Sequence, residues 1–274
     1  MNLTGPPLTA VGVAVIRSRE TERPDRLYAD PYAARFVDAA IPQVAAETWA
    51  TVQKLADLMY ETRTVGVRLV DDALLKSATT GRRQIVLLGA GLDTHAFRLD
   101  WPKPVQLFEI DLPDLFAFKE PLLRDAVPTC ERHVIEADLA DGDWPDALVP
   151  QGFDPAIPTH WVDHALMTLP TAHARAGVEA ITRLSAPSSR YGFPVMGRRS
   201  FDTTLDRVHG AKELYRTMPN IDRGLGDDAR PWLESLGWST TFESFADLAA
   251  PYGRDVGPDT GSGSITATRL TRPA

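Results

Sequence analysis

Cysteine is nearly absent from this sequence. The 274 residues include one, Cys130, which excludes an intramolecular disulfide framework. The amino terminus also lacks the basic stretch followed by an apolar stretch that is typical of a secretory signal. We therefore expect a cytoplasmic protein, in a compartment where thiols stay reduced.

An excess of positive charge is missing as well. The chain has 29 Lys and Arg residues against 37 Asp and Glu residues, and its formal net charge is −8. Such a chain is repelled by nucleic acids and by anionic membrane surfaces, so we expect neither as a partner. An apolar fraction of 43% beside a charged fraction of 24% is ordinary for a globular protein and does not suit a disordered or membrane-spanning chain.

Strand patterns are absent from the first 80 residues. Apolar residues there recur at helical spacing over three stretches, Leu8 to Arg19, Tyr32 to Ala40 and Glu47 to Leu75. We therefore predict a helical cap over residues 1–80 that is integral to the fold.

From Ile85 onward, apolar strand patterns alternate with helical ones. This order predicts a mostly parallel sheet with helices on both faces, in an α/β core over residues 81–274. The last two strand segments predict a closing antiparallel pair. A helical lid is predicted within an insertion at about 198–230. The seven strands are expected at Ile85, Val105, His133–Ala137, His160–Leu166, Arg190–Met196, Trp238–Ser244 and Ser264–Leu270.

The apolar run Gln84–Leu88 ends abruptly at Gly89-Ala90-Gly91. A run without alternation is typical of a strand buried on both faces, and Gly-x-Gly lets the chain turn tightly beside a ligand. A second apolar segment ends with Glu109 and Asp111, which is the spacing of a βαβ unit whose second strand presents a carboxylate to a ribose. The loop alone does not distinguish a cofactor loop from an ordinary turn, and Thr94 departs from the dinucleotide fingerprint.

Several further blocks occur in a fixed order along nearly the whole chain. They are Arg23–Ala33, Gly89–Leu99, Phe108–Pro113 with Phe118-Lys119, Gly152–Pro155, Tyr252–Arg254 and Ala267–Arg269. In this order they resemble the leucine carboxyl methyltransferase-like family of S-adenosylmethionine-dependent O-methyltransferases. The resemblance implies a Rossmann-like class I methyltransferase fold rather than a dehydrogenase.

The same resemblance implies S-adenosylmethionine as the cofactor. Gly89, Ala90 and Gly91 match the loop that lets the backbone approach the methionine part of that cofactor. Asp111 and Glu109 match the position of the carboxylate that accepts hydrogen bonds from the ribose hydroxyls, since an ionised carboxylate can accept two donors at once.

Other family contacts fall on positions further apart in the chain. Asp138 and Leu139 match the pair that contacts adenine, one bonding the exocyclic amine and the other packing on the ring. Arg17 matches a cation that meets the cofactor carboxylate. Asp163 matches an acidic residue of the cofactor side of the site.

The chain departs from the family pattern at three places. Gly66-Val67 stands where the family has Arg-Thr, so a guanidinium that clamps the cofactor carboxylate is missing, and Arg63 or Arg68 is a candidate to replace it. Asp163-His164 stands where the family has Glu-Gly, and His95 replaces an arginine. All three substitutions fall on the cofactor side of the expected site.

His164 is the candidate catalytic base or substrate-orienting group, with Asp163 beside it, because an imidazole titrates near neutrality. The alternative for His164 is a partly buried histidine bonded to the backbone. The run His160–His164 also resembles the inverted zinc motif H-x-x-E-H with aspartate in place of glutamate, but that motif needs a helix and this segment reads as a strand. No metal is therefore expected.

These observations predict an S-adenosylmethionine-dependent O-methyltransferase acting on a carboxyl or hydroxyl group of a small molecule, in secondary metabolism. The alternative is a methyltransferase-like protein that no longer methylates, and instead rearranges or cyclises a natural product or only binds a ligand. Gly66, His95 and His164 motivate that alternative. A protein carboxyl methyltransferase is a third option, although nothing in the lid region indicates a surface for an acidic tail.

Overall fold

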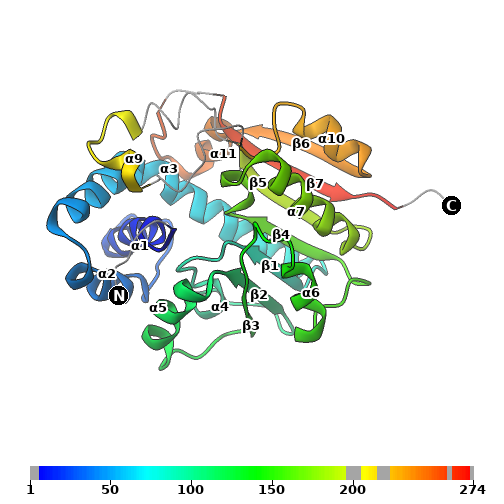
Figure 1. Ribbon diagram of the computed structural model, residues 1–274, viewed down its shortest axis with the longest axis horizontal. Coiled ribbons are helices and arrows are strands. Elements are labelled where there is room, and N and C mark those ends of the chain that lie inside the picture. The colour runs from blue at the N-terminus through cyan, green and yellow to red at the C-terminus, as the bar shows by residue number, and fades with distance from the viewer. Residues whose placement is uncertain (1–5, 196–204, 215–222, 258–260, 272–274) are drawn as a thin grey trace.

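The computed structural model describes residues 6–195, 205–214, 223–257 and 261–271, which form a seven-stranded sheet flanked by helices (Figure 1). The strand order is β3-β2-β1-β4-β5-β7-β6. Strand β7 pairs antiparallel with β5 and β6, and the other pairings are parallel, which confirms the predicted fold class. The strands are β1 (Gln84–Leu88), β2 (Gln106–Asp111), β3 (Glu131–Glu136), β4 (Thr159–Asp163), β5 (Arg190–Val195), β6 (Trp238–Ser244) and β7 (Gly263–Arg269).

Helices precede the first strand, as predicted. They are α1 (Pro6–Glu22), α2 (Ala33–Ala40) and α3 (Ala46–Thr79), and α1 and α3 lie side by side next to the sheet (Figure 1). Among the helices that the structure describes, none is long and apolar enough to cross a membrane. The later helices are α4 (His95–Arg98), α5 (Pro113–Leu123), α6 (Trp144–Leu148), α7 (Thr171–Arg183), α9 (Ala211–Leu214), α10 (Ala229–Ser235) and α11 (Phe245–Ala249).

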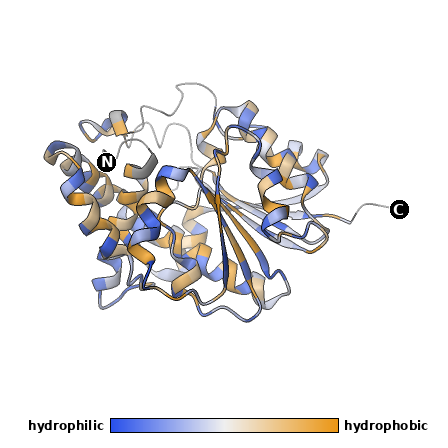
Figure 2. Ribbon diagram, turned by 60° about the horizontal axis from the view of Figure 1, so that its bottom comes forward, coloured by the Kyte–Doolittle hydropathy of each residue, from blue (hydrophilic) through white to orange (hydrophobic). Residues whose placement is uncertain are grey.

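Strand β1 is buried on both faces, which explains its unbroken apolar run. Val86 and Leu88 pack into one hydrophobic core, whereas Ile85 and Leu87 pack into a second core that includes residues of α1 and α3. Figure 2 shows the hydrophobic colour concentrated in the central strands. The loop after β1 therefore starts from a rigid, fully packed strand in the middle of the sheet.

Strand β4 ends earlier than the sequence pattern predicted. The expected strand ran to Leu166, but β4 ends at Asp163 and a short 3-10 turn, Leu166–Thr168, follows. The reason is the Asp163 carboxylate, whose Oδ1 accepts hydrogen bonds from the backbone N–H groups of Ala165 (2.9 Å) and Leu166 (2.7 Å). Since those amides are bonded to a side chain, they cannot continue a sheet ladder.

The predicted lid falls partly outside the described residues. Residues 198–204 and 215–222 of the predicted insertion belong to that part, so the lid stays a prediction. The described residues 205–214 contain α9 and bury Leu205 and Val208 against a cluster formed by α1 and α3. Residues 205–214 therefore pack on α1 and α3.

The carboxyl-terminal part of the chain is tied to α1 and α3 by one buried and one partly exposed polar contact. Arg254 Nη2 donates to Oε1 of the fully buried Glu20 of α1 at 2.8 Å. The Tyr252 hydroxyl donates to Oδ2 of Asp72 of α3, also at 2.8 Å. The Tyr252–Arg254 block of the sequence thus holds α1 and α3 in place over the sheet.

Candidate functional site

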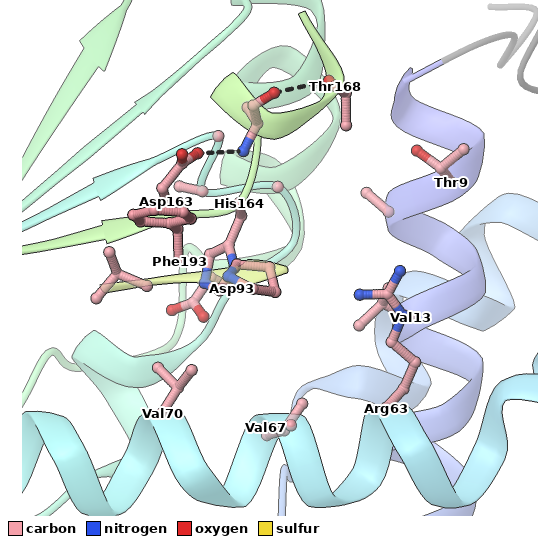
Figure 3. A pocket seen from close by; sticks show the side chains of 18 of the residues that line it. Thr9, Val13, Arg63, Val67, Val70, Asp93, Asp163, His164, Thr168 and Phe193 are labelled. Carbon is pink, nitrogen blue, oxygen red and sulfur yellow. Dashed lines mark hydrogen bonds between the residues drawn. The ribbon is translucent and has the colours of Figure 1, made fainter. Parts of the chain in front are cut away.

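A cavity of about 960 Å³ lies between α1, α3 and the carboxyl ends of the central strands (Figure 3). In open α/β sheets, ligands bind outside the carboxyl ends of the strands where the strand order reverses, and here β1 has β2 on one side and β4 on the other. The Gly89–Gly91 loop lines this cavity, together with Asp111, Asp138 and Leu139. The structure therefore brings together the loop and two of the carboxylates predicted from the sequence, Asp111 and Asp138.

The glycine loop is locked by backbone contacts. Gly89 and Gly91 have φ angles of +74° and +53°, which side chains disfavour. A Cβ atom at Gly89 would lie 2.4 Å from the Cβ of Ala165, so only glycine allows this close approach of the loop after β4. The N–H groups of Gly89 and Ala90 both donate to Ile110 O, at 2.9 and 3.0 Å. The loop therefore has a fixed conformation beside the cavity. The Gly89 and Ala90 N–H groups are bonded to Ile110 and stabilise the fold.

Asp111 joins the end of β2 to the glycine loop. Its Oδ2 accepts from the Gly91 N–H and its Oδ1 from the Leu112 N–H, both at 2.7 Å. Burial nevertheless raises the pKa of Asp111 above its usual value. Each carboxylate oxygen has a second lone pair, so this side chain can still accept two hydroxyl donors from the cavity.

Asp138 and Leu139 form another part of the cavity wall. Asp138 is exposed, and its Oδ1 accepts from the Ala140 N–H at 2.8 Å. Leu139 is buried and belongs to a hydrophobic core of the sheet. The Asp138 carboxylate can accept a hydrogen bond from an amine, and the apolar Leu139 surface can pack against the ring that carries this amine.

Glu109 does not line the cavity, contrary to the expectation from the sequence. Its side chain is fully buried, with Oε2 at 2.6 Å from Lys119 Nζ and 2.7 Å from Arg132 Nη2. The side chains of Glu109 and Asp111 share one face of β2, but only Asp111 stands at the strand end. The structure thus gives Glu109 a role in the core, where it forms ion pairs with Lys119 and Arg132.

Arg17 lines the cavity, but its charge is already paired. The side chain is 4% exposed, with Nη1 at 3.2 Å from Asp30 Oδ2 and Nη2 donating to Leu92 O at 2.5 Å. These contacts tie α1 to the glycine loop. Arg17 therefore positions that loop, and its availability to a cofactor carboxylate is reduced.

Arg63 is the better candidate for a cation that meets a ligand. Its guanidinium points into the cavity from α3, close to Val13 (Figure 3), and it makes no hydrogen bond or ion pair with the described residues. Arg68 instead bonds Asp72 and the Leu27 carbonyl and does not line the cavity. A Cβ atom at Gly66 would meet nothing within 4 Å, so the missing arginine side chain leaves open space beside Arg63.

Asp163 is engaged by the protein itself. Besides the two backbone bonds that end β4, its Oδ2 accepts from the Tyr191 hydroxyl at 2.9 Å. Burial raises the pKa of Asp163 to about 6. These contacts favour a structural role, in which Asp163 fixes the turn that carries His164.

His164 projects into the cavity from the end of β4 (Figure 3). Its imidazole makes no hydrogen bond to the residues that the structure describes, so the alternative of a side chain bonded to the backbone is wrong. The ring is accessible through the cavity but surrounded by protein, and this burial lowers the pKa of His164 to about 4. A neutral imidazole at physiological pH can accept a proton from a ligand.

His95, which replaces the family arginine, is a buried imidazole between two carboxylates. Its Nε2 lies 2.8 Å from Asp71 Oδ1, and its Nδ1 ion-pairs with Asp93 Oδ2. Burial disfavours the charged ring, but the Asp93 carboxylate and then Asp71 outweigh this effect and raise the pKa of His95. The raised pKa favours the positively charged ring at this position, which the sequence could not show.

We expect His95→Gln to lower the free energy of unfolding by roughly 3 kcal/mol at about pH 6, because Asp93 stays buried without its cation. Since the folded-state pKa of His95 is raised, its contribution is complete below the unfolded value of about 6.5 and is lost as the pH rises through the folded value. Urea denaturation of both proteins across this range should show the difference shrinking at alkaline pH. A difference that does not change with pH would mean that His95 is uncharged.

The metal-binding alternative at His160–His164 has no structural support. The segment forms β4 and the turn after it, not the helix that the zinc motif needs. In the ranges that the structure describes, no group of three or more His, Cys, Asp or Glu side chains is placed to hold a metal ion.

The chain is similar to known proteins over most of its length. Residues 10–181 match the family model described as leucine carboxyl methyltransferase. A protein of Frankia alni, provisionally named an S-adenosyl-L-methionine-dependent methyltransferase, is 39% identical over 272 residues, which are 97% of this chain and 95% of that protein. A Parafrankia protein with the same provisional name is 45% identical over 84% of this chain and 76% of its own. A Thermobifida fusca crystal structure, also provisionally named a methyltransferase, shares the fold with a TM-score of 0.56, at 16% identity, over 87% of this chain and 94% of that one.

Proposed function

The chain belongs to the leucine carboxyl methyltransferase family of S-adenosylmethionine-dependent methyltransferases, and on this premise we propose that it methylates a carboxyl or hydroxyl oxygen of a small molecule. The observation that carries the proposal is the cavity, which gathers the loop, the carboxylates and a free cation around one space. We also propose that residues 1–80 are a cap integral to the fold, since α1 and α3 supply much of the cavity wall. A small acceptor suits a site enclosed by these two helices.

The residues present suit S-adenosylmethionine. Asp111 keeps lone pairs for two ribose hydroxyls, Asp138 with Leu139 suits an aminopurine, and Arg63 supplies a cation for a carboxylate. When bound, this cofactor supplies a methyl group activated by its sulfonium. Methyl transfer is an in-line displacement, so the protein acts mainly by holding its ligands in orientation.

His164 is the side chain that we propose to face the acceptor. Its neutral ring can take the proton of an acceptor hydroxyl, whereas a carboxylate acceptor would need only to be oriented. Asp163 accepts a hydrogen bond from the Ala165 N–H. It thereby holds the turn in which Ala165 lies close to Gly89. The assignment of His164 is supported by its position in the cavity wall, and that of Asp163 by its hydrogen bonds.

We expect Arg63→Gln to weaken the binding of S-adenosylhomocysteine about 10- to 100-fold, because a charge-assisted hydrogen bond to the ligand carboxylate is lost. Binding of methylthioadenosine, which lacks the amino-acid part, should stay unchanged. Calorimetric titration of both ligands separates the two cases. Arg68→Gln is the matched control, since Arg68 lies on the same helix but outside the cavity wall. Equal losses for both ligands, or an equal effect of Arg68→Gln, would exclude the clamp.

The alternative, a methyltransferase-like protein that no longer methylates, predicts a different result. It requires that the native protein fails to bind the cofactor and that Gly66→Arg, which restores the family residue, creates binding. The open space at Gly66 means that this variant can be made without a steric clash. Native binding that Gly66→Arg only strengthens would favour the methyltransferase.

A further inference from the structure

The cavity continues beyond the cofactor residues along one face of the sheet. Alternate residues of β5, Arg190 and Gly192, line it, whereas Tyr191 points to the hydrophobic core on the opposite face. In β4, His160 and Val162 line the same side, and in β7 so does Thr266. We call the part of the cavity formed by His160, Arg190, Gly192 and Thr266 the distal compartment.

Glycine leaves this compartment empty of side chains at its centre. A Cβ atom at Gly192 would meet nothing within 4 Å, although Gly192 lies in the middle of a paired strand. Across the cavity, α3 contributes the small or branched apolar residues Val70 and Ala73. The walls between His164 and the distal compartment are thus mainly apolar.

Among the residues that the structure describes, two buried polar atoms of the distal compartment have no hydrogen-bond partner. His160 is 2% exposed and lines the cavity, and its Nδ1 has no hydrogen-bond partner. Arg190 stands beside it in the strand register, donates from Nη2 to Thr266 Oγ1 at 3.2 Å, and leaves its buried Nε unbonded. Buried donors without partners cost free energy, so a ligand that accepts from them is favoured.

The Arg190 guanidinium forms no ion pair with the residues that the structure describes. Burial, followed by repulsion from Arg82, lowers the pKa of Arg190, whereas Glu243 opposes this shift. Glu243 also lines the cavity, but no ion pair joins it to Arg190. Burial lowers the pKa of His160 to about 3, so its ring is neutral and can donate through Nδ1.

We propose that the distal compartment binds an anionic group at the far end of an apolar acceptor substrate. This proposal rests on the proposed function only in calling the ligand the acceptor. His160 precedes His164 by four residues of extended chain, about 13 Å at roughly 3.3 Å per residue. The substrate is therefore an elongated acid, and the anion held by Arg190 is not the group that receives the methyl.

Decanoate is a suitable probe, with decanol as its uncharged counterpart. Calorimetry should show that the protein binds decanoate, and that Arg190→Gln weakens this binding by at least about tenfold. Gly192→Val should abolish it, because the new side chain fills the compartment while valine suits a strand. Arg83→Gln, which removes an exposed cation outside the cavity wall, should change nothing.

Three results would overturn the proposal: no binding of decanoate, equal binding of decanol, or decanoate binding that survives both Arg190→Gln and Gly192→Val. S-adenosylhomocysteine is titrated in the same samples, with and without decanoate. Its affinity should be the same in all three variants, since Arg190 and Gly192 lie away from the cofactor residues. Failure of S-adenosylhomocysteine to bind would contradict the proposed function and leave the decanoate result standing.

Discussion

Asp111→Ala should weaken the binding of S-adenosylhomocysteine by about 100-fold or more. The carboxylate can accept two ribose hydroxyls, and each hydrogen bond to a charged group contributes about 1.5–3 kcal/mol. The same side chain also bonds the Gly91 and Leu112 amides, so its loss loosens the loop that shapes the site. Calorimetric titration gives the affinity of both proteins.

Two further variants keep this result interpretable. Asp111→Asn preserves the shape of the side chain but not its charge, and should give an intermediate loss. Asp138→Ala removes an exposed carboxylate and should cost about tenfold at most, since water competes for exposed hydrogen bonds. Wild-type affinity in a folded Asp111→Ala protein would exclude Asp111 from the cofactor site.

Glu109→Gln should lower the free energy of unfolding by about 3–5 kcal/mol without changing cofactor affinity. The substitution removes the negative charge between Lys119 and Arg132, and leaves the fully buried Lys119 ammonium uncompensated. Chemical denaturation measures the stability, and the titration described above measures the affinity. The pair of results separates a core residue from a ribose ligand.

Glu120→Gln is the matched control for this prediction. Glu120 bonds the same Arg132 at 2.7 Å, but its side chain is 42% exposed. An exposed ion pair contributes about 1 kcal/mol or less, so this variant should be close to wild type. A stable Glu109→Gln protein that has lost cofactor affinity would restore the ribose contact expected from the sequence.

Local sequence patterns were sufficient for the sheet and for the loop. The unbroken run at Gln84–Leu88 marks a strand buried on both faces, and Gly89 with Gly91 marks the turn at its end. The position of Asp111 beside the loop was also predictable, because Asp111 is the last residue of the next strand, β2. Glu109 was not, since its burial depends on Lys119 and Arg132, which come from α5 and β3.

The choice among cations and histidines needed three-dimensional contacts. The family resemblance assigned Arg17 to the cofactor carboxylate and left Arg63 or Arg68 as the replacement for the arginine missing at Gly66. The structure shows Arg17 and Arg68 paired within the protein, whereas Arg63 has no hydrogen bond or ion pair with the described residues. His95 was recognised only as a replacement of the family arginine, and its contacts show that Asp93 raises its pKa. The strand end at Asp163 was also missed, because a side chain there bonds the amides that would extend β4.

The distal compartment could not be predicted from the sequence, because it also depends on contacts between distant residues. His160, Arg190 and Thr266 are far apart in the chain and meet through the register of β4, β5 and β7. No local motif links them. Their common signal is the alternation of cavity-facing residues along each strand, which becomes informative only when the neighbouring strand is known.

The most direct test of the whole account is a calorimetric titration of the unmodified protein with S-adenosylhomocysteine. The account predicts saturable binding at one site, because Asp111, Asp138, Leu139 and Arg63 line one cavity. No binding at millimolar ligand would contradict it and would favour a methyltransferase-like protein that has lost its cofactor.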